Sequence, residues 1–464
     1  MMKTRTMKTI TCLLLVGMMT AGAGCGGGGD TSSAVQPVTK EEWQAVIDSY
    51  DSGKQIMIAG WDNPKHSYEA YKTAADMGLT HLFIWQDRGN FAPGDKVGEG
   101  SEDMEEMQTW FTELGLKAIW QTGSAMNSTE AGKFNEKLRN YSCVEGVDIF
   151  DEPRMNAMEN LRTAMKEFDA EYGSELLCFT NILPLSSSPT DLQGTYPDYL
   201  EKYKAAVSEI EKGRRIVSVD VYPLLDRDGP VLDATWLSNM YQLRTLANEL
   251  DSEFNMFIQS VGYTGHRKPE EEKEIRYQVW TDLCFGITSY TYFTYANDPN
   301  PNDGWQYTET ICNSDGVPNN EKFYNGCKRV NEEISKLAST YRSFDWEGVL
   351  VSYGTQSDML VDAGLFNLSV YAMQEADFIE SYQSQYGAVL GVYGEAQGGN
   401  ALVVTNYTDP AENKGNQIDI RFKDTDTVLM YRQGEWEYSR AVNGEFEVVL
   451  ESGEGVFLIP CKLR

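Results

Sequence analysis

The chain has 464 residues, of which 41% are hydrophobic and 12% aromatic, so it is long enough for two or three domains with large cores. Its 70 acidic residues outnumber 39 basic ones, and the formal net charge of −31 is spread along the chain. So acidic a protein repels polyanions. This excludes nucleic acid and anionic lipid as expected partners and leaves neutral molecules compatible.

The N-terminus has the pattern of a secretory signal. Basic residues precede an apolar run over residues 10–19, and small residues then lead to Cys25. The ending resembles the lipobox of bacterial lipoproteins, in which the cysteine is lipidated, although Gly22 stands where that motif usually has Leu. The run is too short to span a membrane. We therefore predict a signal peptide over residues 1–24, a flexible tether over residues 25–38, and a protein that is secreted across the inner membrane and held in the cell envelope by its lipid anchor.

Histidine and cysteine are too scattered for a metal site. His66, His81 and His266 lie far apart, and there is no CxxC pair. We expect neither a metal nor a cofactor. Cys312 and Cys327 could pair in an oxidising compartment, but their spacing does not decide it.

From residue 54 onward, apolar runs rich in β-branched and aromatic residues alternate with segments of helical spacing. The runs predicted as strands are 55–61, 80–87, 116–121, 144–153, 176–181, 216–223, 255–260 and 287–295. The predicted helices are 39–50, 68–77, 104–114, 130–141, 156–168, 199–211, 234–250, 269–286 and 319–341.

This rhythm predicts an α/β fold, a (β/α)8 TIM barrel over residues 39–343. A doubly wound open sheet is the competing architecture, but it usually has a Gly-rich phosphate turn after an early strand, and none follows Trp61.

After residue 344 the helical spacing stops. Short alternating segments separated by Gly, Asn and Asp predict an all-β antiparallel sandwich over residues 344–464. The expected strands are 348–353, 365–373, 387–393, 401–406, 417–422, 427–431, 446–450 and 455–460. We expect this domain to support the barrel or to extend its substrate surface.

Two adjacent acids close the fourth predicted strand. The apolar run from Val144 ends in Asp151, Glu152 and Pro153, and the proline must end the strand. In a TIM barrel this end of the strand faces the active site. The alternative is that Asp151 caps the next helix and Glu152 is a solvated loop acid.

The C-terminal ends of the predicted strands carry carboxylates, amides and aromatic residues, and no Lys, Cys or His. Carboxylates and amides bond sugar hydroxyls, aromatic faces stack on sugar rings, and glycoside hydrolysis needs a pair of carboxylates. These residues are Trp61, Asp62, Gln86, Asp87, Gln121, Asp151, Glu152, Asn181, Asp220, Tyr222, Gln259, Tyr295, Asn297 and Asp298.

Together these strand ends resemble a known family. The motifs are Asp-Glu-Pro at 151–153, Asp-Val-Tyr-Pro at 220–223, Ile-Gln-Ser at 258–260, the helix over 270–280 and Tyr-Phe-Thr-Tyr at 292–295. They are similar to the β-galactosidase-like (family 42-like) glycoside hydrolase barrels of bacterial surface lipoproteins, over roughly residues 50–340. The resemblance implies a TIM barrel acting on a carbohydrate.

The resemblance makes Glu152 the general acid/base, because the related retaining enzymes carry Asn-Glu at the fourth strand. Two positions differ: Asp151 replaces the Asn, and Gln259 stands where the nucleophilic Glu is expected. An amide cannot form the glycosyl ester. Three alternatives follow: Asp220 is the second carboxylate, in a retaining or inverting layout; Asp151 orients a substrate acetamide, as in substrate-assisted hexosaminidases; or the cleft only binds glycan.

The leading hypothesis is a lipid-anchored glycoside hydrolase with Glu152 as general acid/base and Asp220 as the second carboxylate. Asp151 is the third catalytic candidate. The expected substrate-binding residues are Trp61, Gln86, Asn181, Tyr222, Gln259, Tyr295 and Trp305. The alternative is a non-catalytic glycan-binding lipoprotein of a polysaccharide uptake system, which the amide at Gln259 favours.

Overall fold

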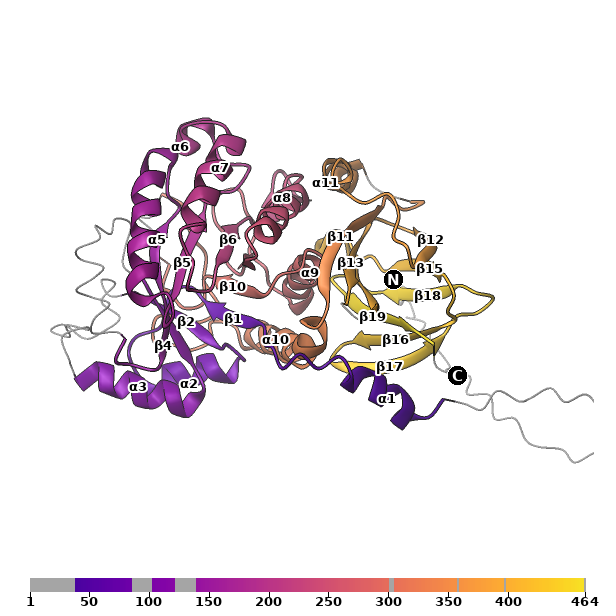
Figure 1. Ribbon diagram of the computed structural model, residues 1–464, viewed down its shortest axis with the longest axis horizontal. Coiled ribbons are helices and arrows are strands. Elements are labelled where there is room, and N and C mark those ends of the chain that lie inside the picture. Colours follow the sequence, from indigo (N-terminus) through magenta and orange to yellow (C-terminus); the bar gives the residue numbers. More distant parts are fainter. Residues whose placement is uncertain are drawn as a thin grey trace, which may run out of the picture. The chain divides into compact units, whose positions relative to one another are not determined.

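The computed structural model describes residues 38–85, 102–121, 139–299, 304–356, 359–395 and 398–462 (Figure 1). Residues from Thr39 on form one compact unit. The expected signal peptide and tether, Cys25, Gln86 and most of the helix predicted over 130–141 lie outside these ranges, and their predictions stay predictions. None of the helices described is long and apolar enough to cross a membrane.

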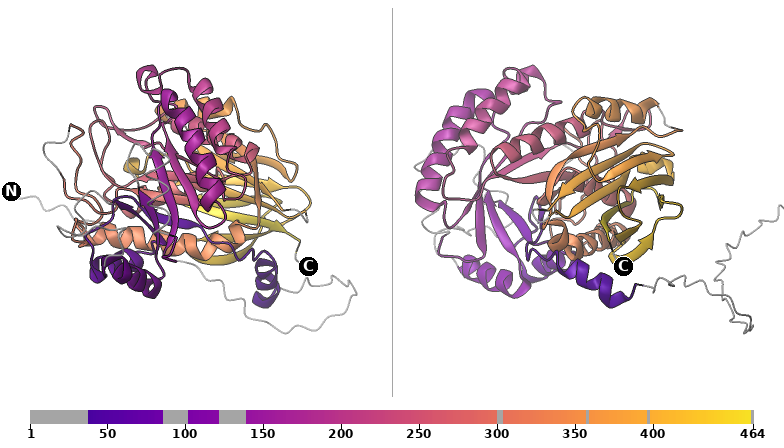
Figure 2. Two further views of the ribbon diagram at one scale, coloured as in Figure 1. Left: turned by 60° about the vertical axis from the view of Figure 1, so that its left-hand side comes forward. Right: turned by 45° about the vertical axis from the view of Figure 1, so that its right-hand side comes forward.

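Eight parallel strands close into a barrel in chain order, which confirms the TIM-barrel prediction (Figures 1 and 2). The first strand pairs with both the second and the last, so Met57 lies beside Ser289 and Ala59 beside His81. The strands are β1 (Met57–Gly60), β2 (His81–Trp85), β3 (Lys117–Gln121), β4 (Val144–Asp151), β5 (Leu177–Ile182), β6 (Ile216–Asp220), β9 (Glu253–Gln259) and β10 (Ser289–Phe293).

All helices before residue 344 except the N-terminal one cover the outside of the barrel (Figure 1), and most coincide with the helical spacing in the sequence. The N-terminal helix begins with a capping box, in which Thr39 and Glu42 each bond the other's backbone N–H. The helices are α1 (Lys40–Asp48), α2 (Tyr68–Asp76), α3 (Glu102–Leu114), η1 (Met155–Ala157), α5 (Met158–Tyr172), α6 (Pro189–Leu192), α7 (Tyr196–Val207), α8 (Trp236–Glu249), α9 (Glu272–Leu283) and α10 (Glu321–Tyr341).

The barrel strands are apolar because both of their faces are buried. Outward side chains join the helices in one core. Inward side chains, among them Phe83, Phe179 and Phe257, form a separate cluster inside the barrel with Trp61 above them. A short hairpin that the sequence did not reveal, β7 (Leu224–Asp226) with β8 (Pro230–Leu232), follows β6.

Two antiparallel sheets form the C-terminal domain, which confirms the predicted sandwich. A six-stranded sheet has the order β11-β13-β14-β19-β16-β17, and a three-stranded sheet has the order β12-β15-β18. The elements are β11 (Asp345–Ser352), α11 (Met359–Ser369), β12 (Ile379–Ser384), β13 (Ala388–Gly394), β14 (Asn400–Asn406), η2 (Pro410–Glu412), β15 (Asn416–Phe422), β16 (Thr427–Arg432), β17 (Glu435–Arg440), β18 (Phe446–Leu450) and β19 (Gly455–Cys461).

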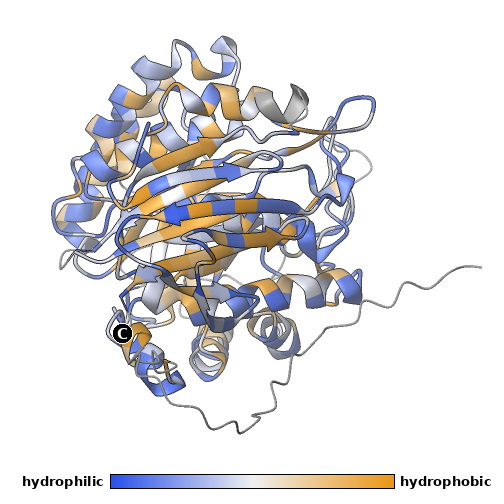
Figure 3. Cartoon of the chain, turned by 90° about the vertical axis from the view of Figure 1, so that its right-hand side faces the viewer, coloured by the Kyte–Doolittle hydropathy of each residue, from blue (hydrophilic) through white to orange (hydrophobic). Residues whose placement is uncertain are grey.

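The β-domain has its own core between the two sheets, with Leu390, Val404, Ile420 and Leu458 among its members. Hydrophilic and hydrophobic residues alternate along its strands (Figure 3), as buried and more exposed positions do along β15 and β18. The other face of the six-stranded sheet packs on the barrel helix α9. The central strands of that sheet, such as β14, are therefore buried on both faces.

One predicted strand is wrong. Residues 365–373 were expected to be extended, but α11 runs through Ser369 and packs against α8 and β11. Its residues are mostly apolar, so neither the helical nor the strand period stands out, and the tertiary contacts decide the conformation.

Candidate active site

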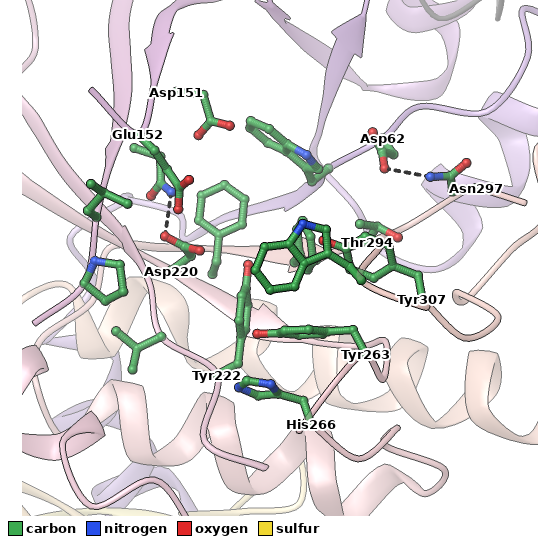
Figure 4. Close-up of a pocket in the computed structure, with 18 of the residues that line it drawn as sticks. Asp62, Asp151, Glu152, Asp220, Tyr222, Tyr263, His266, Thr294, Asn297 and Tyr307 are labelled. Atoms are coloured by element: carbon green, nitrogen blue, oxygen red, sulfur yellow. Dashed lines mark hydrogen bonds between the residues drawn. The ribbon is translucent and has the colours of Figure 1, made fainter. Parts of the chain in front are cut away.

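A pocket of about 690 Å³ lies at the C-terminal ends of the barrel strands (Figure 4). This is the end at which TIM barrels carry their active sites, and the volume is typical of a small-ligand site. Most of the side chains predicted from the sequence to form the site line this pocket: Trp61, Asp151, Glu152, Asn181, Asp220, Tyr222 and Trp305.

The end of β4 is distorted so that both of its acids face the pocket. Pairing with β5 shifts register between Asp148 and Phe150, and Glu152 has a left-handed φ of 48°. Along a regular strand, consecutive side chains would face opposite sides. Here Asp151 and Glu152 both line the pocket. Neither η1 nor α5 has a side-chain cap, so Asp151 does not cap the following helix.

Hydrogen bonds hold this turn in place. The backbone N–H of Glu152 donates to the carbonyl of Asn181 at 3.0 Å. The Tyr199 hydroxyl donates to the carbonyl of Pro153 at 2.8 Å and accepts from the N–H of Leu183 at 3.2 Å. The acids at the end of β4 are thereby tied to β5 and to α7.

Asp220 reaches the same pocket from the end of β6. Its Oδ1 accepts a hydrogen bond from Asn181 Nδ2 at 3.0 Å. Figure 4 shows Asp220 and Glu152 directed into one part of the pocket, with Asp151 above them. Burial raises the pKa of Asp220 well above its ordinary value, and the negative charges of Glu152 and Asp151 raise it further, while the bond from Asn181 acts in the opposite direction.

Glu152 also holds its proton more tightly than an ordinary glutamate. The residue keeps solvent-exposed surface, but the protein atoms packed around its carboxyl partly desolvate it and raise its pKa; the Asp191 carboxylate adds to this, and Arg154 opposes it. Deeper in the barrel, burial and the charge of Asp151 raise the pKa of Asp148 well above its usual value. The pocket is therefore a coupled carboxyl cluster that retains protons at a pH where isolated carboxyls have lost theirs.

Aromatic rings line the pocket. Trp61 packs edge-on against Trp85 and Phe257, at centroid distances of 5.6 and 5.2 Å. In the same cluster, Tyr222 stacks on Phe293 at 5.1 Å. Burial, aided by the charge of Asp220, raises the pKa of Tyr222, so its hydroxyl stays protonated as a donor. Flat rings of this kind suit the apolar faces of sugars.

A loop after β9 adds residues that sequence reasoning missed. Tyr263 and His266 stack at 4.0 Å, and Tyr263 also contacts Trp305 and Tyr307. Burial lowers the pKa of His266, so the ring is neutral at pH 7. Trp305 is 60% exposed and forms the outer rim. The aromatic residues shortly after the seventh predicted strand were the available signal.

Gln259 is not part of the pocket, which corrects its expected role as a sugar-binding residue. Its side chain has no exposed surface. Nε2 donates to the carbonyls of Arg267 at 2.7 Å and Leu224 at 3.2 Å, and Oε1 accepts from the N–H of Leu224 at 3.0 Å. The amide binds the loops together, so it says nothing about the chemistry of the site.

Tyr295 does not line the pocket either, which corrects its expected role as a stacking residue. It lies fully buried on the outer side of the barrel, where a Cβ added at Gly60 would come within 2.8 Å of its Cβ. A ring without exposed surface cannot stack on a sugar. Gln86, the remaining substrate-binding candidate, lies outside the part of the chain that the structure describes.

The described residues contain neither the disulfide that the sequence left open nor a metal-binding cluster. Cys312 and Cys327 are both buried free thiols, so the disulfide left open by their spacing is not formed. Within the described ranges, no three His, Cys, Asp or Glu side chains are arranged to hold a metal ion.

Comparisons identify no family. No protein-family model and no curated protein matches the chain. A family 39 glycoside hydrolase from Bacteroides cellulosilyticus is 12% identical, over 89% of this chain and 82% of that one, with a TM-score of 0.41. An endo-β-1,4-mannanase from Thermotoga petrophila is 12% identical over 85% and 97%, with a TM-score of 0.41. A family 27 β-L-arabinopyranosidase from Geobacillus stearothermophilus is 10% identical over 89% and 99%, with a TM-score of 0.42. At such values these likenesses establish no activity.

Proposed function

We propose that the protein is a glycoside hydrolase in which Glu152 is the general acid and Asp220 the second carboxylate. The observation that carries this proposal is the convergence of Glu152 and Asp220 on one aromatic-walled pocket at the C-terminal end of the barrel. A pair of carboxyls, one of them protonated, is what hydrolysis of a glycosidic bond requires.

In the proposed reaction, Glu152 gives its proton to the glycosidic oxygen as the bond to the anomeric carbon breaks. Asp220 either attacks that carbon or takes a proton from the attacking water. The pKa values of both carboxyls are raised, so the pair retains the proton that an acid catalyst gives, and the strand-end position of Glu152 is what assigns the acid role to it. Asp151, Asn181 and Tyr222 line the pocket where sugar hydroxyls would lie, and Trp61 and Trp305 offer stacking faces.

The position of Asp151 favours a second arrangement. Because Asp151 faces the pocket beside Glu152, it could orient the 2-acetamido group of an amino sugar, whose carbonyl oxygen would then attack the anomeric carbon. This scheme demands an acetamido sugar, whereas the Asp220 scheme does not. The alternative of a non-catalytic glycan-binding protein loses its main support, because Gln259 is buried outside the pocket.

Two matched substitutions separate these arrangements. We expect Asp220→Asn to lower kcat on a hydrolysed glycan by about 10² or more, and Asp151→Asn to have the smaller effect. The measurement is kcat and KM for both variants on substrates with and without a 2-acetamido group. A larger loss in Asp151→Asn, confined to acetamido sugars, would transfer the second role to Asp151.

A further inference from the structure

Polar side chains occupy part of the barrel interior, where branched apolar residues are usual. They are Asn181 on β5, Ser218 on β6, Asn255 on β9 and Thr291 on β10, each at most 3% exposed. Strand register places Asn181 beside Ser218, and Ser218 beside Asn255. The row begins directly beneath the carboxylate of Asp220.

These side chains form a continuous hydrogen-bonded chain. The Thr291 hydroxyl donates to Asn255 Oδ1 at 3.2 Å, and Asn255 Nδ2 donates to the hydroxyl of Ser218 at 3.0 Å. The Ser218 hydroxyl donates to Asn181 Oδ1 at 3.0 Å, and Asn181 Nδ2 donates to Asp220 Oδ1 at 3.0 Å. Every donor in the chain therefore points toward Asp220.

The direction of the chain suits a negative charge at its end. An ionised carboxylate only accepts hydrogen bonds, and Asn181 has its NH2 group toward Asp220. A protonated Asp220 that donated to Asn181 would require the amides of both Asn181 and Asn255 to turn over inside the barrel. Aligned donors also polarise one another, which strengthens the last bond to the carboxylate.

We propose that Ser218, Asn255 and Thr291 are positioning residues that act through Asn181 to favour the ionised form of Asp220 and to fix its orientation. The catalytic consequence rests on the proposed function, in which Asp220 must be charged while Glu152 carries the proton. The ionisation of Asp220 can be measured independently of any activity.

Other groups near Asp220 also influence its ionisation. Glu152 and Asp151 approach it from the end of β4 and disfavour its charge. Tyr263, from the loop after β9, and Tyr196, at the start of α7, also lie within its field. Among these groups the two acids disfavour the ionisation of Asp220, and the hydrogen bond from Asn181 is the side-chain feature that opposes them.

Ser218→Ala breaks the chain in the middle, because it removes one donor and one acceptor without adding volume. Ser218→Thr keeps the hydroxyl and is the conservative rescue. Thr291→Val removes the first donor while keeping the side-chain shape, and it serves if Ser218→Ala does not fold. Ser289→Ala is the matched control, because Ser289 is a buried barrel serine whose hydroxyl has no hydrogen-bond partner in the described structure.

The experiment is a carbon-13 NMR titration of aspartate-labelled full-length protein in the Glu152→Gln background, where the titration of Asp220 no longer couples to Glu152. The Asp220 signal is assigned by its loss in Asp220→Asn. We expect Ser218→Ala to raise the Asp220 midpoint by about half a pH unit or more, Thr291→Val to raise it less, and Ser218→Thr and Ser289→Ala to leave it in place. Equal midpoints in Ser218→Ala and its parent overturn the proposal.

Activity assays on proteins that retain Glu152 distinguish the positioning proposal from the glycosidase proposal. If the glycosidase proposal holds, the acid limb of the kcat/KM profile moves to higher pH in Ser218→Ala, and its basic limb stays. A shifted NMR midpoint with no glycan turned over supports the positioning chain and refutes the glycosidase. An active enzyme whose midpoint and acid limb are both unmoved refutes the positioning chain alone.

Discussion

Glu152 shows how much of the site depends on the backbone of one residue. Its left-handed φ is unusual for a residue with a side chain and costs roughly 1 kcal/mol or more. The bonds from its own N–H to Asn181 and from Tyr199 to Pro153 hold it there. The Asp-Glu-Pro sequence predicted a strand end with two acids. It did not show that both acids face the pocket, because this depends on a register shift against β5.

A charged cluster at the opposite end of the barrel predicts a pH dependence of stability. Glu145 lies 3.4 Å from His81 Nε2 and 2.8 Å from Arg214 Nη1. The close contact with His81, with help from Arg214 and against burial, lowers the pKa of Glu145 to about 2. Because the folded pKa is below the unfolded one, this stabilisation is complete above about pH 4.5 and is lost as the pH falls toward 2.

We therefore expect Glu145→Gln to lower the free energy of unfolding by ~1–2 kcal/mol at pH 7, a value reduced for the partial exposure of the pair. The difference from the natural protein should shrink between pH 4.5 and 2. Urea unfolding across this range is the measurement. Glu249→Gln, which breaks the more exposed pair with Lys204, is the control. A constant difference at every pH would contradict this assignment.

At the scale of the elements, α9 and the six-stranded sheet pack so closely that two positions of the sheet must be glycine. A Cβ at Gly391 would lie 2.4 Å from the carbonyl oxygen of Cys284, and one at Gly455 would lie 2.7 Å from the ring of Trp280. The first contact is with helix backbone and the second with a buried tryptophan ring, and neither can move aside easily in a close-packed interface.

Gly391→Ala should therefore reduce the free energy of unfolding by about 2 kcal/mol or more, because the helix and the sheet must separate. Thermal unfolding measures this. Gly415→Ala is the matched control, since a Cβ there meets its nearest atoms at an ordinary 3.7 Å. Similar melting temperatures for the two variants would show that the interface relaxes at little cost.

The number of buried apolar residues in a strand explains whether the sequence revealed it. The barrel strands are buried on both faces, so their runs were clear and all eight were located. Edge strands β12 and β17 pair on one side only and bury few residues, and both were missed.

The sequence also placed the acids Glu152 and Asp220 at strand ends. The burial of Gln259 depends on partners in loops that no local pattern links to it.

At the scale of the whole molecule, the β-domain supports one wall of the pocket. Asp409 of the β-domain forms a bidentate pair with Arg267, at 2.5 and 3.1 Å, and both side chains are largely buried. Arg267 lies in the same loop as Tyr263 and His266, and its carbonyl accepts the bond from Gln259. The pairing residues are 142 positions apart, so the sequence did not predict this support.

Asp409→Ala removes the bidentate partner of Arg267 and leaves this largely buried charge with only the longer contact to Glu274, at 3.7 Å. We expect the free energy of unfolding to fall by about 3 kcal/mol and the KM for a hydrolysed glycan to rise more than kcat falls, because the loop with Tyr263 and His266 loses its anchor. Asn413→Ala removes a more exposed contact of the same domain with Lys273 and is the control. If KM is unchanged in a destabilised Asp409→Ala, the β-domain supports the fold without shaping the pocket.

The most direct test of the glycosidase proposal is the release of reducing ends from a panel of neutral polysaccharides by the natural protein and by Glu152→Gln. We predict that the natural protein hydrolyses at least one glycan and that Glu152→Gln binds this glycan but turns it over about 10²–10⁴ times more slowly. Equal turnover by both proteins would contradict the role of Glu152. Binding by the natural protein without any turnover across the panel would make the pocket a glycan-binding site.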